Sequence, residues 1–200
     1  MIKIDLLRPA FSFGANTYLL SSCGECCVID PATPYREDYL HGKLKYILLT
    51  HCHFDHILEI DSWVNATGAE VLISAEDGKG LSDPEINCYG YFMNISKGFS
   101  GKYTVLKDGD FINIGSDTLS VLSCPGHTEG SLSFVGEGVA FIGDTVFAGG
   151  GYGRCDLPSG DFQKLKQSIK RIINYPSNTV LYCGHGPKTT VGEYKVAIYF

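Results

Sequence analysis

The stretch Leu49-Thr50-His51-Cys52-His53-Phe54-Asp55-His56 decides the fold and the chemistry of this chain. It leaves an apolar run and sets three imidazoles and one carboxylate close together. If the chain stays extended, residues 51, 53 and 55 share one face, because side chains alternate along a strand. Imidazole and carboxylate are ligands of zinc and iron in proteins. The H-x-H-x-D-H pattern therefore predicts a metal site rather than three surface histidines.

Three further residues of metal-ligand type follow strand signals later in the chain. His127 comes after a Pro-Gly turn, Asp144 follows a glycine, and His185 lies between two glycines. Each residue alone is weak evidence for a metal site, since a single histidine after a strand is more often a surface or hydrogen-bonded residue. Together they complete a set that two divalent cations would need: His51, His53, Asp55, His56, His127, Asp144 and His185. His41 lies outside the pattern, and we interpret it as solvated.

The rest of the chain alternates short β-rich runs with two helical segments. Runs bounded by Gly, Pro, Ser or Asp predict strands over 2–7, 17–21, 26–30, 45–50, 70–73, 110–114, 118–123, 131–135, 139–142 and 178–183. Helical spacing predicts helices over 57–66, closed by Thr67-Gly68, and over 161–173. Residues 81–101 are irregular and aromatic, as in a loop that lines a cleft. Two blocks of strands followed by a helix predict one α+β (mixed α/β) domain over residues 1–200, with two packed sheets and outer helices.

Composition and charge exclude several function classes. With 44% hydrophobic and 19% charged residues the chain is globular, and its 200 residues bury a core without disulfides. A net charge of −6 with no basic tract argues against nucleic-acid or anionic-membrane partners. No apolar run spans a membrane, and residues 1–8 lack a signal peptide's apolar region, so we expect a cytoplasmic protein. Its eight cysteines are then reduced, and Cys23-x-x-Cys26 lacks a second pair for a zinc site.

The motifs at 50–56, 125–128, 143–147, 153–156 and 184–189 resemble, in order, those of metallo-β-lactamase-fold hydrolases. Within that superfamily they are similar to the hydroxyacylglutathione hydrolase (glyoxalase II) type. The resemblance implies a four-layer αββα sandwich with the site at one edge of the sheets. It also implies two divalent metal ions, zinc with iron or manganese as alternatives. By resemblance, His51, His53 and His127 hold one ion, Asp55, His56 and His185 hold the other, and Asp144 bridges them.

The resemblance also implies a reaction. A dinuclear site lowers the pKa of a shared water, which then attacks a carbonyl, here of a small anionic thioester such as a hydroxyacylglutathione. Asp55 is the expected catalytic residue, since it can accept a hydrogen bond from the nucleophile. The commonest β-lactamases carry cysteine where this chain has Asp144, so antibiotic hydrolysis is not expected. Because the chain stops at Phe200, we expect the compact single-domain type.

Substrate contacts are expected in the glycine-rich stretch 149–153 and just beyond it. Arg154 is expected to grip a carboxylate of the thiol, with Tyr152 beside it. The alternative for Arg154 is an ion pair with Asp156 or Asp161 that pins the loop. Members of the compact type typically read Gly-Arg-Thr-Asp here, and Cys155 departs from that pattern.

Two other functions remain open from the sequence. A persulfide dioxygenase, a close relative by resemblance, would use His51, His127 and Asp144 to hold one iron. A non-catalytic metal-binding protein is the second alternative, although decayed family members are expected to lose ligands and all seven are present here.

Overall fold

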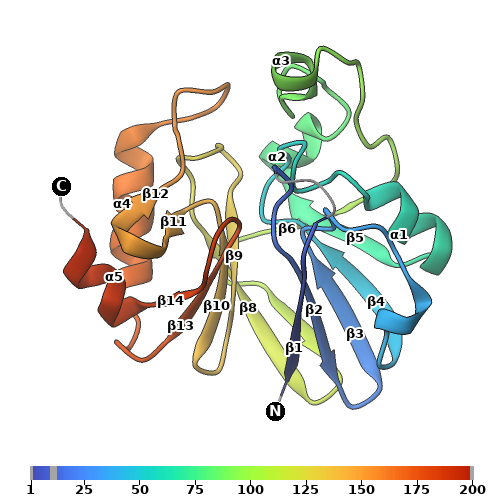
Figure 1. Ribbon diagram of the computed structural model, residues 1–200, viewed down its shortest axis with the longest axis horizontal. Helices are drawn as coiled ribbons and strands as arrows, with labels where there is room; N and C mark the ends of the chain where they lie inside the picture. Colours follow the sequence, from blue (N-terminus) through green and yellow to red (C-terminus); the bar gives the residue numbers. More distant parts are fainter. Residues whose placement is uncertain (1, 10–12, 199–200) are drawn as a thin grey trace.

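The computed structural model describes residues 2–9 and 13–198 and shows two six-stranded sheets facing each other (Figure 1). The first sheet follows chain order, with β1–β3 antiparallel and β3–β6 parallel. Its strands are β1 Lys3–Leu7, β2 Thr17–Ser22, β3 Glu25–Ile29, β4 Lys43–Leu48, β5 Glu70–Ser74 and β6 Thr104–Leu106.

The second sheet has the order β14-β13-β10-β9-β8-β7. All its pairs are antiparallel except β10 with β13. Its strands are β7 Phe111–Ile114, β8 Asp117–Ser123, β9 Leu132–Gly136, β10 Val139–Gly143, β13 Val180–Cys183 and β14 Thr189–Thr190. A two-stranded ribbon, β11 Val146–Phe147 with β12 Gly151–Tyr152, stands apart from both sheets.

On the outer faces, α1 Ile60–Thr67 covers the first sheet, and α4 Phe162–Ile173 and α5 Val191–Ala197 cover the second (Figure 1). The short helices α2 Ala75–Gly80 and α3 Tyr89–Met93 lie at the top of this view, beyond the ends of the strands, and short 3-10 turns occur at Glu37–Tyr39 and Ala148–Gly150 (Figure 1). The core has three layers: Trp63 of α1 packs on one sheet, Phe134 and Leu48 meet between the sheets, and Ile169 of α4 packs on the other. This is the expected four-layer αββα sandwich, a single domain of mixed α/β class.

The first helix begins later than the sequence pattern indicates. The prediction started it at residue 57, but three successive tight turns occupy 53–60 and α1 begins at Ile60. Those turns let Asp55 and His56 face the same region. Gly68 ends the helix in the left-handed conformation, at a φ of 66°, as the Thr-Gly signal predicts.

Several short elements were not predicted. They are α2, α3, α5, β6, β11, β12 and β14, and α3 lies inside the stretch 81–101 expected to be a loop. All eight cysteines are free thiols, and six of them are buried, as expected. Within the part of the chain that the structure describes, no helix is long and apolar enough to cross a membrane.

Candidate metal centre

Each sequence-predicted ligand lies just past the end of a strand. The segment 51–56 follows β4, His127 follows β8, Asp144 follows β10 and His185 follows β13. The first segment belongs to one sheet and the other three residues to the second sheet. Facing sheets therefore bring all seven side chains together, and three subsets of them have ligand atoms within 4.8 Å of one another: His51, His53 and His127; His51, His56 and Asp144; Asp55, His56 and His185.

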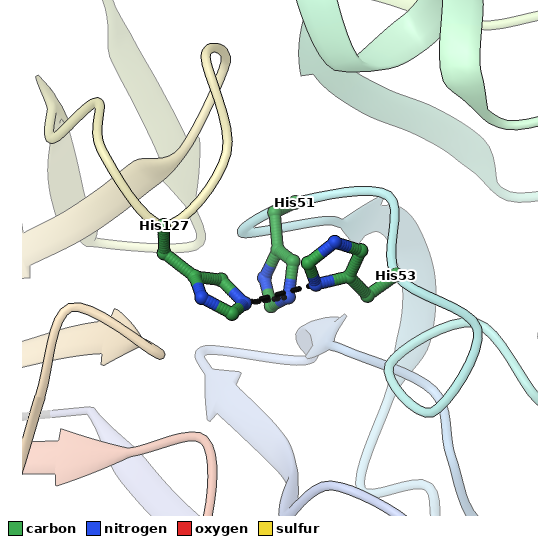
Figure 2. A group of neighbouring side chains, drawn as sticks. All are labelled: His51, His53 and His127. Carbon is green, nitrogen blue, oxygen red and sulfur yellow. Dashed lines mark hydrogen bonds between the residues drawn. The ribbon is translucent and has the colours of Figure 1, made fainter. Parts of the chain in front are cut away.

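The first subset is a triangle of imidazole nitrogens (Figure 2). His127 Nε2 lies 2.9 Å from His53 Nδ1 and 3.2 Å from His51 Nε2. The rings stand nearly perpendicular to one another, at 84° to 88°. In a tetrahedral site with metal–nitrogen bonds near 2.0–2.1 Å, neighbouring nitrogens are separated by about 3.3 Å. The three nitrogens therefore fit three of the four ligand positions around a tetrahedral metal ion.

Hydrogen bonds behind two of these rings, those of His51 and His127, turn their lone pairs toward the centre. Thr50 Oγ1 donates to Asp30 Oδ2 at 2.7 Å, so it accepts from His51 Nδ1 at 3.0 Å. His127 Nδ1 donates to the Arg154 carbonyl at 2.7 Å. A proton on Nδ1 leaves Nε2 as the free electron pair, which is how outer partners fix a metal-binding tautomer.

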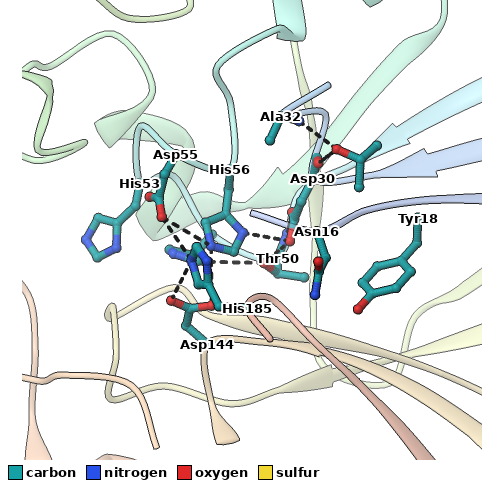
Figure 3. A network of polar contacts seen from close by, with 12 residues as sticks. Asn16, Tyr18, Asp30, Ala32, Thr50, His53, Asp55, His56, Asp144 and His185 are labelled. Carbon is teal, nitrogen blue, oxygen red and sulfur yellow. Dashed lines mark hydrogen bonds and ion pairs between the residues drawn. The ribbon is translucent and has the colours of Figure 1, made fainter. Parts of the chain in front are cut away.

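Asp144 touches both halves of the cluster (Figure 3). Its Oδ1 is 3.3 Å from His56 Nε2, while its Oδ2 is 3.5 Å from His185 Nε2 and 3.7 Å from His127 Nε2. In the third subset, Asp55 Oδ2 lies 3.0 Å from His185 Nε2. Because Asp144 contacts histidines of all three subsets, it is the carboxylate that would bridge two ions.

Gly184 makes room for that carboxylate. A Cβ at this position would lie 2.1 Å from Asp144 Oδ1 and 2.7 Å from His56 Cε1, so any side chain would displace a candidate ligand. The glycine before His185 is thus dictated by the crowding of the ligands themselves.

Asp30 is a functional residue that sequence reasoning missed. It is buried at the end of β3, and its carboxylate accepts from Thr50 N at 2.8 Å, Thr50 Oγ1 at 2.7 Å and His56 Nδ1 at 2.8 Å (Figure 3). It therefore orients His56 directly and His51 through Thr50. The available signal was an aspartate after an apolar run, the same pattern that identified Asp144.

Asp77 ties the two ligand-bearing loops together. Its buried carboxylate accepts from Cys52 N at 3.0 Å, Thr128 Oγ1 at 2.7 Å and Gly130 N at 2.8 Å. Burial raises its pKa despite these three donors. On the other side, Asn16 Nδ2 donates to the carbonyls of Cys183 and Gly186 and so holds the His185 turn against the first sheet.

The electrostatics of the cluster favour a cation. Burial opposes ionisation of Asp144 and Asp55, but His56 together with His185 outweighs it and keeps the pKa of both carboxyl groups below their usual range. Burial also opposes a charge on His56, yet Asp144, Asp30 and Asp55 raise its pKa well above the ordinary value. Burial lowers the pKa of His51 well below its usual range and that of His53 to about 3. The donor set fits divalent metals, because the carboxylates of Asp30, Asp55 and Asp144 gather negative charge around His56 that a bound cation would neutralise.

A cleft of about 400 Å³ opens on this cluster. Five of the seven candidate ligands line it, while His51 and His56 lie behind them, 1% and 0% exposed. A larger groove of about 1010 Å³ beside β1 reaches the cluster only at His185. The smaller cleft is therefore the approach to the metal ligands.

The two predicted substrate contacts lie in different surroundings. Arg154 lines the cleft, but its guanidinium forms a two-bond ion pair with Asp156, both bonds at 2.8 Å, which is the alternative weighed from the sequence. Tyr152 is not among the residues that line the cleft, and its ring packs on Phe162 at 5.8 Å. His41 is exposed and lies near Asp5, away from the cluster, as expected.

The model of the metallo-beta-lactamase superfamily matches residues 12–185 of this chain. The chain therefore belongs to the metallo-beta-lactamase superfamily. A hydroxyacylglutathione hydrolase of Haemophilus influenzae is 32% identical, covering 97% of this chain and 95% of that protein. A probable metallo-hydrolase of Bacillus subtilis is 31% identical, covering 92% of this chain and 90% of that protein.

Three solved structures share the fold. A B3 metallo-beta-lactamase, BLEG-1, superposes with a TM-score of 0.85 at 31% identity, covering 96% of this chain and 95% of that one. TTHA1623 in a di-iron-bound form gives 0.81 at 26% identity, covering 98% of each chain. ETHE1 from Myxococcus xanthus gives 0.76 at 25% identity, covering 98% of this chain and 82% of that one.

Proposed function

We propose that this hydrolase of the metallo-beta-lactamase superfamily cleaves a small anionic thioester, such as a hydroxyacylglutathione, at a two-metal centre. The observation that carries the proposal is the seven-residue His/Asp cluster behind a cleft that exposes five of its members. The similarity to the hydroxyacylglutathione hydrolase of Haemophilus influenzae supports the choice of a thioester.

When bound, two divalent cations supply a hydroxide nucleophile near neutral pH and polarise the carbonyl that it attacks. His51, His53 and His127 would hold one of them, Asp55, His56 and His185 the other, with Asp144 between them. Asp55 would accept a hydrogen bond from the attacking water, a role that its position in the cleft lining supports. A thiolate leaves without a proton, so the cleft needs no general acid.

We propose zinc as the metal, with iron or manganese as alternatives, since imidazole and carboxylate suit all three. The eight free thiols support a reducing compartment, for which we propose the cytoplasm. The partner is the small-molecule substrate. Neither a nucleic acid nor a membrane is part of the proposal.

A persulfide dioxygenase is the second candidate. One observation favours it: His127 Nε2 lies 3.2 Å from His51 Nε2 and 3.7 Å from Asp144 Oδ2, so a compact two-histidine, one-carboxylate set exists inside the larger cluster. Such a set suits a single iron and oxygen chemistry.

Metal content and substrate panels separate the candidates. Protein purified without added metal is assayed for bound metals, thioester hydrolysis, oxygen uptake with glutathione persulfide and cleavage of a β-lactam. His53→Ala and His56→Ala are compared with His41→Ala, a control at an exposed histidine outside the cluster.

If the protein is the proposed hydrolase, we expect about two bound metal ions per chain and cleavage of a thioester. Activity should be lost in both cluster variants but not in the control. A single iron that persists in His53→Ala, together with oxygen uptake, would identify the dioxygenase instead. Bound metal without turnover of any of these substrates would leave a non-catalytic metal-binding protein.

A further inference from the structure

We propose that the acyl half of the substrate is apolar and about the size of an aromatic ring, rather than a short hydroxyacyl group. This inference rests on the proposed thioester hydrolase and specifies its substrate class. It is carried by the wall of the cleft, which is built from four phenylalanines and a leucine: Phe13, Phe54, Phe92, Phe147 and Leu157.

The wall begins at the metal ligands. Phe54 stands between His53 and Asp55 in the chain, and the Phe147 ring lies 6.2 Å from the His185 ring. Phe92 lies 5.6 Å and Phe13 6.1 Å from Phe54, which extends the apolar surface outward from the cluster. A carbonyl held at the metals therefore has its substituent against these rings.

Much of this apolar surface is exposed, because no other part of the described protein packs on it. Phe13 is 42% exposed and Phe92 46% exposed, whereas Phe54 beneath them is 7% exposed. Apolar area left open inside a concave site is area that a ligand can bury, at a gain proportional to the area removed from water.

The polar side chains of the cleft already have partners or belong to the candidate ligand set. Five of its lining residues are the candidate metal ligands His53, Asp55, His127, Asp144 and His185. Cys88, which also lines the cleft, directs its Sγ to the Ile86 carbonyl at 3.6 Å. Arg154 is the cationic residue in the lining. Its guanidinium is paired with Asp156 and lies over the Phe92 ring, 5.7 Å from the ring centroid. An acyl hydroxyl would meet rings and stay unpaired, at a cost, so the acyl half takes the aromatic wall. Asp156 accepts from only two guanidinium nitrogens of Arg154, so its remaining N–H donors can bind the anionic thiol at the rim.

The test is a thioester series on one thiol, glutathione, with acetyl, lactoyl, butyryl, hexanoyl and phenylacetyl groups. We expect kcat/KM to rise by about two- to fourfold per added methylene. Lactoyl is expected to fall below butyryl, and phenylacetyl to rank highest. A second series keeps the acyl group and varies the thiol, and it should show no comparable trend.

Phe92→Ala supplies the matched perturbation. The ratio of kcat/KM for phenylacetyl over acetyl should fall by about three- to tenfold, the size of an aromatic contact. Phe111→Ala is the control, because Phe111 is 72% exposed on β7 and does not line the cleft, so that ratio should stay at the wild-type value.

Non-hydrolysable thioethers give a readout that does not need turnover. S-benzylglutathione should bind the metal-loaded protein at least tenfold more tightly than S-methylglutathione. A flat acyl series, a preference for lactoyl, or equal binding of the two thioethers would overturn the inference while leaving the thioester hydrolase intact. No hydrolysis of any thioester, with tight binding of S-benzylglutathione, would instead reject the proposed function and keep the apolar site.

Discussion

Asp30→Asn is the sharpest test of how the centre is held. The Asp30 carboxylate accepts three hydrogen bonds, two from Thr50 and one from His56 Nδ1. An asparagine has one oxygen to accept with, and if it keeps the bond from Thr50 N, its amide N–H groups face His56 Nδ1. His56 must then present a lone pair at Nδ1 and move its proton to Nε2. That nitrogen is the atom that lies among the candidate ligands.

The size of the effect follows from the bonds involved. A hydrogen bond to a charged group contributes about 1.5–3 kcal/mol. Loss of an outer partner of a metal-binding histidine typically lowers metal affinity by about 10–100-fold, which is about 1.4–2.7 kcal/mol. The two estimates agree, so we expect Asp30→Asn to lower zinc affinity by 1 to 2 orders of magnitude, at roughly that energy.

The measurement is zinc competition with a chromophoric chelator at pH 7. Asp38→Asn is the control, since Asp38 is an exposed aspartate paired with Arg36. If Asp30→Asn binds zinc within about twofold of wild type while Asp38→Asn does the same, the outer carboxylate does not set the His56 tautomer and the reasoning is wrong.

Three other perturbations should change KM, the free energy of unfolding or the metal content in a defined direction. Arg154→Ala should raise KM for anionic thioesters by about tenfold and spare neutral ones, while Asp156→Asn, which frees the guanidinium, should lower it; equal losses on both substrate types would assign Arg154 to loop structure. In metal-free protein, the low pKa values of His51 and His53 mean that the unfolded chain binds up to two protons below pH 6.5 that the folded chain does not. The free energy of unfolding in urea should therefore fall between pH 6.5 and 5, by up to about 2.7 kcal/mol per pH unit, and a flat profile would contradict this. Gly184→Ala should strip metal, measured by elemental analysis, because its Cβ would lie 2.1 Å from Asp144 Oδ1; full metal content would show that the carboxylate can move aside.

Long periodic segments made much of the fold predictable. The helix α4 has apolar residues at helical spacing over 12 residues, and Asp161 caps it by accepting from Gln163 N and Lys164 N. Strands of two or three residues such as β6, β11, β12 and β14 lack any such period, since their pairing comes from tertiary contacts. The α5 helix has a local sequence signal, the capping box of Thr190 and Glu193 at its start, although the strand and helix pattern does not predict it.

The candidate site likewise contains residues that the sequence predicts and residues that it does not. Candidate ligands are recognisable because histidines and aspartates after strands are chemically unusual, and the facing sheets bring the predicted seven together. Asp77 and Asn16 belong to no local motif, and the side-chain hydrogen bonds described above for Asp30, Asp77 and Asn16 reach 20 or more positions along the sequence. The carbonyl of Arg154 orients His127 whatever its side chain is, so no residue pattern could reveal that contact.

The division of ligands between the sheets has a consequence for how the protein assembles. The first sheet is complete at Leu106 and supplies residues 51–56, whereas the second runs from Phe111 to Thr190 and supplies His127, Asp144 and His185. Each half can form its own strand pairs, but only their docking creates a complete cation site. Binding free energy, about 4.1 kcal/mol at a metal concentration 1,000 times Kd, then acts on the docking step alone. Removing metal should accelerate hydrogen exchange first where the sheets face each other, before the strand pairing within either sheet is lost.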